Sequence, residues 1–144
     1  MTSEGFDPGR FITAQERIYA AALAELQAGC KQMHWMWFIF PQLRGLGLSP
    51  TSQFYGLATL EEARAYLAHP VLGRRLKACT QAVLAHEGQT ARAIFGSPDD
   101  LKLRSSMTLF DRADGGANTP YRAVLHGFFG GEADPLTLEL LRRA

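Results

Sequence analysis

Cysteine is scarce in this chain of 144 residues, and neither sign of charge is in excess. The two cysteines, Cys30 and Cys79, lie far apart and outside any Cys-x-x-Cys pattern, which fits reduced thiols and does not indicate a disulfide framework. Fifteen Lys and Arg residues balance fourteen Asp and Glu residues. The resulting net charge of +1 gives no indication of binding to nucleic acid or to an anionic membrane.

Long apolar runs are also missing. The longest, residues 35–40, is far shorter than the roughly 20 residues that a bilayer span requires, and the N-terminus lacks the basic and apolar regions of a signal peptide. His69, His86 and His126 show no spacing typical of metal ligands, so no metal site is expected. With 47% hydrophobic and 20% charged residues, the composition is that of a globular domain. We therefore expect a soluble, cytoplasmic protein.

Signals for helix starts are dense. Capping boxes, in which Thr is followed by Glu three residues later, occur at 13–16 and 59–62. The first predicts a helix that begins after Thr13 and ends at Gly29. The second predicts a helix that ends at His69, because the residue before a proline disfavours the helical region.

Prolines mark further helix starts. Pro70 is placed as the first residue of the next helix, whose expected buried stripe consists of Leu72, Leu76, Cys79 and Val83. A capping residue followed by proline recurs three times, at Ser97 with Pro98, Thr119 with Pro120, and Asp134 with Pro135. Asp99 and Asp100 then suit the first turn of a helix electrostatically.

No stretch alternates apolar and polar residues for long enough to indicate a strand. Residues 35–40 fit either a buried strand or a buried helix, and we favour a short helix because a lone strand would leave its backbone unpaired. The sequence thus predicts an all-α, single compact domain of about six to eight short helices. This domain is expected at residues 10–144, after a flexible N-terminus at 1–9.

Both tryptophans lie beside a histidine in the segment around His34. These aromatic residues either form the centre of the core or line a polar pocket, because buried indole and imidazole groups need partners. On a helix, Trp35 and Trp37 are about 200° apart. We expect Trp35 to anchor the core, and Trp37, with His34 on its face, to border a polar site that includes Gln42.

A glycine-rich stretch follows, with Arg44 before it and Ser49, Ser52 and Tyr55 after it. It is either a plain turn between helices or an anion site, at which Arg44 would lie near a helix N-terminus. The spacing matches neither a Walker A loop nor a dinucleotide-binding loop.

A third segment places Lys102 and Ser105 on one predicted helix. The spacing typical of Ser–Lys nucleophile pairs is absent. The segment is therefore either a ligand-binding face or a polar face whose serines bond to the carbonyl four residues before them.

The same segments resemble the domain of unknown function 1810 family, and the resemblance extends over roughly residues 10–142. Its most specific part is the peptide His34-Trp35-Met36-Trp37-Phe38-Ile39-Phe40-Pro41-Gln42, and it continues at Gly45-Leu46-Gly47, Ser49, Ser52, Tyr55, His69-Pro70-Val71-Leu72-Gly73, Ile94-Phe95-Gly96, Asp99, Lys102 and Ser105-Ser106-Met107-Thr108-Leu109-Phe110. Met33 departs from the pattern, which has a small polar residue before the histidine. The resemblance implies a compact all-α domain but no activity, cofactor or catalytic residue.

Two functions fit these patterns. The first is a small-ligand binding protein or enzyme that acts on a nucleotide or ribosyl compound. Its predicted acid–base group is His34, and its predicted binding residues are Trp37, Gln42, Arg44, Ser49, Ser52, Tyr55, Lys102 and Ser105. The second is a non-catalytic helical protein-interaction module with an exposed apolar patch, used for example in homo-oligomers. Neither pattern identifies a cofactor.

Overall fold

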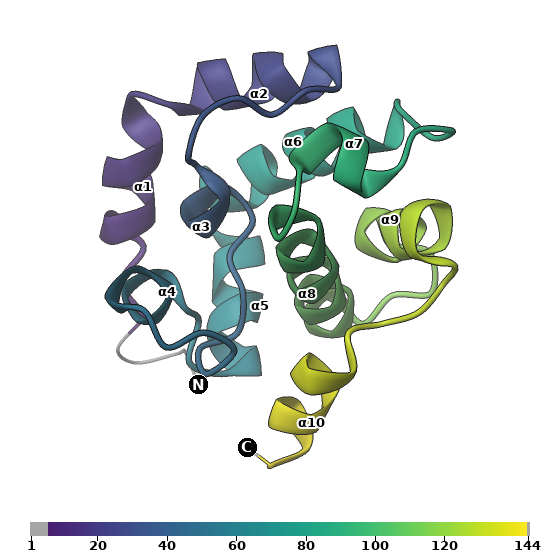
Figure 1. Ribbon diagram of the computed structural model, residues 1–144. Coiled ribbons are helices and arrows are strands. Elements are labelled where there is room, and N and C mark those ends of the chain that lie inside the picture. Colours follow the sequence, from purple (N-terminus) through teal and green to yellow (C-terminus); the bar gives the residue numbers. More distant parts are fainter. Residues whose placement is uncertain (1–5, 144) are drawn as a thin grey trace.

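The computed structural model describes residues 6–143, which form ten helices in this part of the chain (Figure 1). The helices are α1 (Gly9–Glu16), α2 (Tyr19–Ala28), α3 (Met36–Ile39), α4 (Pro50–Tyr55), α5 (Leu60–Ala68), α6 (Leu72–Leu84), α7 (Ala91–Phe95), α8 (Asp99–Asp114), α9 (Pro120–Phe129) and α10 (Pro135–Arg143). The all-α prediction is confirmed, whereas six to eight helices is too few. Of the predicted flexible N-terminus, residues 1–5 lie outside the described residues, and α1 already begins at Gly9.

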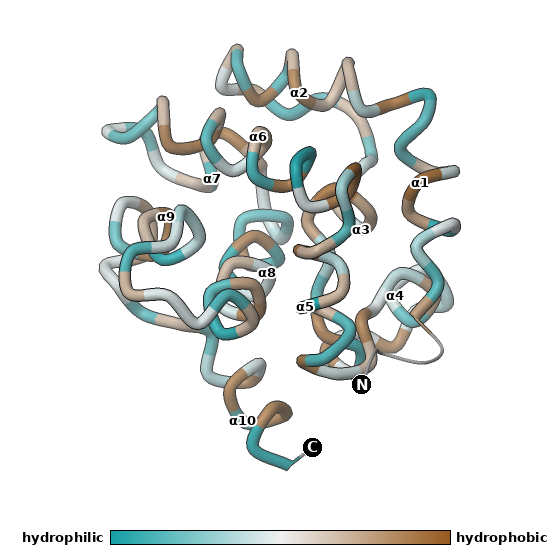
Figure 2. The backbone as a smooth tube through the Cα atoms, turned by 180° about the vertical axis from the view of Figure 1, so that it is seen from behind, coloured by the Kyte–Doolittle hydropathy of each residue, from teal (hydrophilic) through white to brown (hydrophobic). Residues whose placement is uncertain are grey.

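Helix α8 occupies the centre of the fold. Helices α5 and α9 pack on it from different sides, α6 packs against both of these, and α2 lies across α6 (Figure 1). Most residues between Leu103 and Ala113 are buried, so α8 is enclosed along most of its length. Figure 2 shows hydrophobic and hydrophilic segments interleaved along α2, α6 and α8, as expected of helices with one buried face. Within residues 6–143, no helix combines the length and the apolar character that crossing a bilayer requires.

Three predicted caps are present in the structure. Thr59 accepts a hydrogen bond from the backbone N–H of Glu62, Thr119 accepts one from that of Arg122, and Asp134 accepts one from that of Thr137. Gly29 ends α2 with a φ of 75°, a left-handed conformation that favours glycine. The stripe predicted for α6, consisting of Leu72, Leu76, Cys79 and Val83, is wholly buried.

The prediction of a single helix between Thr13 and Gly29 is wrong. Thr13 lies inside α1, and the chain turns at Arg17 and Ile18 before α2 begins. Buried Gln15 explains the break, because its side-chain amide donates to the carbonyl of Phe38 at 2.6 Å and to the hydroxyl of Tyr66 at 3.1 Å. These bonds hold the end of α1 against α3 and α5, so α2 needs a new direction to bury its own face.

Two prolines sit differently from their predicted positions. Helix α6 begins at Leu72 rather than Pro70, and Nδ1 of His69 accepts hydrogen bonds from the backbone N–H groups of Val71 and Leu72. The histidine side chain therefore caps the helix, and Pro70 precedes it. Pro98 is likewise the residue before α8 rather than its first residue.

Candidate functional site

Trp35 anchors the core, as predicted. It lies immediately before the short helix α3, its side chain is fully buried, and its ring packs near those of Phe40 and Phe95 at 6.2 and 6.3 Å between centroids. Its indole N–H donates to Oε1 of Glu25 at 2.8 Å, which satisfies the polar atom of a buried ring. The prediction of a short helix over this segment is also confirmed.

Four of the residues predicted to bind a ligand line one hollow of about 340 Å³. They come from three places: Trp37 from α3, Gln42 from the segment after it, and Lys102 and Ser105 from α8. The remaining lining is mostly apolar or small and consists of Leu46, Gly47, Pro98, Leu101, Asp134 and Leu136. The fold thus brings together side chains that are far apart in the sequence.

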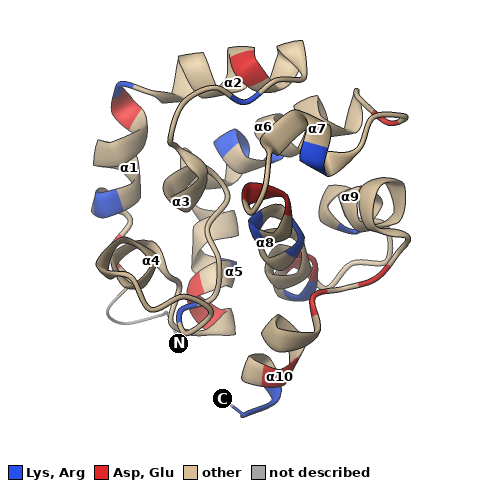
Figure 3. Ribbon diagram, in the orientation of Figure 1, with Lys and Arg blue, Asp and Glu red and all other residues tan. Residues whose placement is uncertain are grey.

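Lys102 lies against both an aromatic ring and a carboxylate. Its ammonium nitrogen is 4.1 Å from the centre of the Trp37 ring, within the range of a cation–π contact, and 3.0 Å from Oδ1 of Asp99. The other oxygen of Asp99 accepts from the ammonium of Lys31 at 2.9 Å. Two cations therefore share one carboxylate at the start of α8, where Figure 3 shows acidic and basic residues close together.

The charge of Asp99 is stabilised by its partners. Partial burial acts to raise the pKa of this carboxyl group, but the hydrogen bonds from Lys31 and Lys102 outweigh burial and hold its pKa below the ordinary value. Asp99 is therefore ionised at neutral pH, and the cluster of Lys31, Asp99 and Lys102 carries one net positive charge. An ammonium has three donors, of which Asp99 accepts one from Lys102, and Lys102 lines the hollow.

The other polar groups of the hollow differ in how far they are already engaged. Within residues 6–143, the side-chain amide of Gln42 makes no hydrogen bond, although the residue is half-buried. Ser105 is buried and donates to the carbonyl of Leu101 at 3.2 Å, as expected for a serine inside a helix. The Asp134 carboxylate accepts from the backbone and the hydroxyl of Thr137, so it is engaged in capping α10.

His34 does not lie on the face of Trp37. Helix α3 begins only at Met36, so His34 lies in a bend before it and the helical spacing assumed for the two residues does not apply. The His34 side chain is exposed, and the residue is not part of the lining of the hollow. The expectation that His34 borders the same site as Trp37 is therefore wrong.

Arg44 is at the opposite end of α4 from the predicted anion site. Its guanidinium donates to the carbonyls of Gln53 at 3.1 Å and Gly56 at 3.0 Å, which are groups at the C-terminal end of the helix. The guanidinium of Arg10 donates to the carbonyl of Phe54 in the same region. Because both arginines satisfy carbonyls that the helix leaves unpaired, this turn is built for helix termination.

The other predicted residues of this turn also have local structural roles. Ser49 caps α4 by accepting from the backbone N–H of Ser52 at 3.1 Å, and the Ser52 hydroxyl donates back to the Ser49 carbonyl. Tyr55 packs against Phe11 and Phe38, with ring centres 5.8 and 5.4 Å away. None of these three residues lines the hollow beside Trp37.

Lys31 and Asp99 were not predicted as site residues. Asp99 was interpreted as an acid in the first turn of a helix, which is correct, but it also pairs with two lysines. Its distance of three residues from Lys102 is a local signal for that ion pair. The pairing with Lys31 joins distant parts of the sequence and has no local signal. Among the residues that the structure describes, no three His, Cys, Asp or Glu side chains converge as they would at a metal site.

The chain is similar to a solved structure and to a family of proteins. The crystal structure of the conserved hypothetical protein Rv1873 from Mycobacterium tuberculosis is 51% identical in sequence, with a TM-score of 0.92 over 96% of this chain and 99% of that one. No curated protein matches the sequence. The model of the family described as "protein of unknown function (DUF1810)" matches residues 5–141. The chain therefore belongs to the DUF1810 family.

Proposed function

We propose that this cytoplasmic protein binds a small anion that carries a flat ring, of the nucleotide or ribosyl class, in the hollow beside Trp37. The contact of Lys102 with Trp37 supports this proposal most strongly, because it places a cation and an aromatic face at 4.1 Å inside one hollow. A volume of about 340 Å³ falls within the usual size of small-molecule sites.

Each group in the hollow has a chemical part in such binding. The free donors of Lys102 suit a phosphate or carboxylate oxygen. The Trp37 ring and the apolar side chains of Leu46 and Leu101 suit the face of a flat ring. The unpaired amide of Gln42 both donates and accepts, so it suits the edge of a base or the hydroxyls of a ribose. Asp99 keeps Lys102 in place before the ligand arrives, which lowers the entropy lost on binding.

Titration with AMP, NAD and ADP-ribose tests the proposal, with tryptophan fluorescence and thermal unfolding as readouts. We expect at least one of them to change the emission of Trp37 and to raise the melting temperature. The K102Q substitution is expected to weaken binding about tenfold or more, because a charge-assisted hydrogen bond is worth about 1.5–3 kcal/mol. K77Q is the matched control, since Lys77 is exposed on α6.

The fluorescence signal can be assigned to its residue. The W37F variant keeps only the buried Trp35, so we expect its emission to respond little to the same ligands. If none of the three compounds stabilises the protein at millimolar concentration, the nucleotide proposal is wrong. The acid–base role of His34 stays a prediction, and it concerns only a substrate that extends beyond the hollow.

The second candidate function is that of a protein-interaction module, and an apolar rim on the same hollow favours it. Leu101 is 55% exposed and Leu136 is 52% exposed, and both line the hollow. Exposed leucines that lie together are typical of surfaces that bind another protein, including a second copy of the chain. Sedimentation velocity of the wild type and of a variant with both leucines replaced by serine separates the two functions. Concentration-dependent association that the double substitution removes would favour the module.

A further inference from the structure

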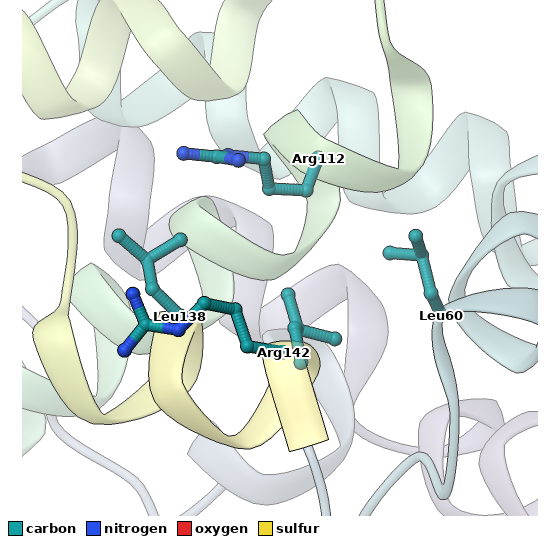
Figure 4. Close-up of a pocket in the computed structure, with 5 residues that line it drawn as sticks. Leu60, Arg112, Leu138 and Arg142 are labelled. Carbon is teal, nitrogen blue, oxygen red and sulfur yellow. The ribbon is translucent and has the colours of Figure 1, made fainter. Parts of the chain in front are cut away.

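A second hollow, of about 420 Å³, lies where α5, α8 and α10 meet (Figure 4). Its lining consists of three leucines, Leu60, Leu138 and Leu141, and two arginines, Arg112 and Arg142. The leucines are half-buried and the arginines are exposed. The hollow therefore has apolar walls and a cationic rim.

The two arginines are not placed evenly around the hollow. In Figure 4 the guanidinium groups of Arg112 and Arg142 both lie on the side of Leu138, while Leu60 lies at the opposite end. One end is thus cationic and the other is apolar. A ligand that matched both ends would carry a negative charge at one end and a hydrocarbon arm at the other.

In the described part of the chain, the cations near this end outnumber the carboxylates that pair with them. Within residues 6–143, Arg112 makes no ion pair and no side-chain hydrogen bond. Arg142 pairs with Glu139, but Glu139 also pairs with Arg143, so one carboxylate serves two cations. Arg112, Arg142, Arg143 and Glu139 together therefore carry two net positive charges.

Arg112 also lines a third hollow, of about 370 Å³. The acidic residue of that hollow is Asp111, and both of its oxygens are engaged, one by the hydroxyl of Thr119 at 2.8 Å and the other by Nε of Arg122 at 3.2 Å. The bonds to this carboxylate come from Thr119 and Arg122, and none comes from Arg112 within the described residues. The planar guanidinium of Arg112 is therefore left to a ligand, and its fork of donors matches a carboxylate.

We propose that the hollow between α5, α8 and α10 binds a small amphipathic carboxylate. The carboxylate lies between Arg112 and Arg142, and its hydrocarbon arm lies along Leu138 and Leu141 towards Leu60. The proposed ligand is a medium-chain fatty acid or a similar acid with one apolar arm, because the hollow has one cationic end and apolar walls. This inference is independent of the function proposed for the hollow beside Trp37.

Calorimetric titration with octanoate tests the inference, with 1-octanol and propionate as matched probes. Octanol keeps the arm without the charge, and propionate keeps the charge with a much shorter arm. We expect octanoate to bind at least tenfold more tightly than either. Equal binding of octanol and octanoate, or no binding of octanoate, would overturn the inference.

Substitutions then locate the binding. We expect R112Q to weaken octanoate binding about tenfold or more, and R112K to restore part of it because the charge returns without the fork. R92Q is the control, since Arg92 is an exposed arginine on α7 outside this hollow. Unchanged affinity in R112Q would overturn the inference.

A further variant separates this site from the other. K102Q is expected to leave octanoate binding unchanged, because Lys102 lines the hollow beside Trp37 and is not part of the lining of this one. Loss of octanoate binding in K102Q would place the acid in that hollow instead and overturn this inference. Failure of nucleotides to bind bears only on the function proposed for that other hollow.

Discussion

Replacement of Trp35 by Ala tests how the core is built around α3. The Trp35 side chain is fully buried, and its ring lies near those of Phe40 and Phe95 and 5.1 Å from the ammonium of Lys31. The substitution removes the whole indole, and the surrounding rings come from separate segments that cannot all collapse into the space. A cavity should therefore remain.

The expected loss has two parts. Truncation of a buried Trp or Phe to Ala costs about 3–5 kcal/mol of unfolding free energy. The indole also donates to Glu25 at 2.8 Å, and a hydrogen bond to a charged group is worth about 1.5–3 kcal/mol. Because Glu25 is only half-buried, water can hydrogen-bond to its carboxylate in the variant and offset part of this loss. We therefore expect W35A to lose about 4–6 kcal/mol. W35F, which keeps a ring but loses the donor, should lose about 2 kcal/mol.

Urea unfolding followed by circular dichroism measures both losses, with W37A as the matched control. Trp37 is only half-buried and its ring borders a hollow, so W37A should lose much less than W35A, about 1–2 kcal/mol. An equal or larger loss in W37A would show that the core is centred on Trp37, and the assignment of the two tryptophans would then be wrong.

Three further predictions concern stability. Burial acts to raise the pKa of Glu25, but hydrogen bonds from backbone N–H groups and the Trp35 indole hold that pKa below its ordinary value. The ionised carboxylate therefore stabilises the fold above about pH 4.5, and this stabilisation is lost as the pH falls. E25Q should flatten the decline in melting temperature between about pH 5 and pH 3. G73A should cost about 3 kcal/mol in urea unfolding, because a Cβ there would lie 2.1 Å from the backbone oxygen of Leu67, and unchanged stability would contradict that packing. Thr119→Val removes both a helix cap and the hydroxyl that donates to buried Asp111, so thermal unfolding should show a loss of about 3 kcal/mol, whereas a loss below about 1 kcal/mol would mean that water replaces the hydroxyl.

Local chemistry in the sequence predicted much of the fold. The stripe of α6 and the caps at Thr59 and Thr119 depend only on residues within one or two helical turns, so the sequence contains all the information that they need. The break after α1 does not depend on neighbouring residues alone. It depends on Gln15, whose partners Phe38 and Tyr66 are distant in the sequence, and a capping box at Thr13 is locally just as good a signal.

The candidate site was predicted less completely, for two physical reasons. The face of a helical residue depends on where the helix starts, and α3 begins two residues after His34, so the spacing between His34 and Trp37 carries no information about a shared face. The partner of a charged side chain depends on what else is near it. Arg44 finds backbone carbonyls within its own turn rather than an anion. In contrast, the large ring of Trp37 and the charged side chain of Lys102 are both half-buried. They do border one hollow.

The two proposed sites share one rigid element, α8, and its geometry keeps them apart. Lys102 belongs to the first turn of this helix and Arg112 to its last. Ten residues of α-helix span about 15 Å, and the two side chains border different hollows. The buried residues between them fix the direction of each, because α8 cannot rotate without disturbing the packing of α5 and α9. The direction in which each side chain leaves the helix is therefore fixed before any ligand binds, and substitutions at Lys102 and Arg112 should have additive effects on the free energy of unfolding.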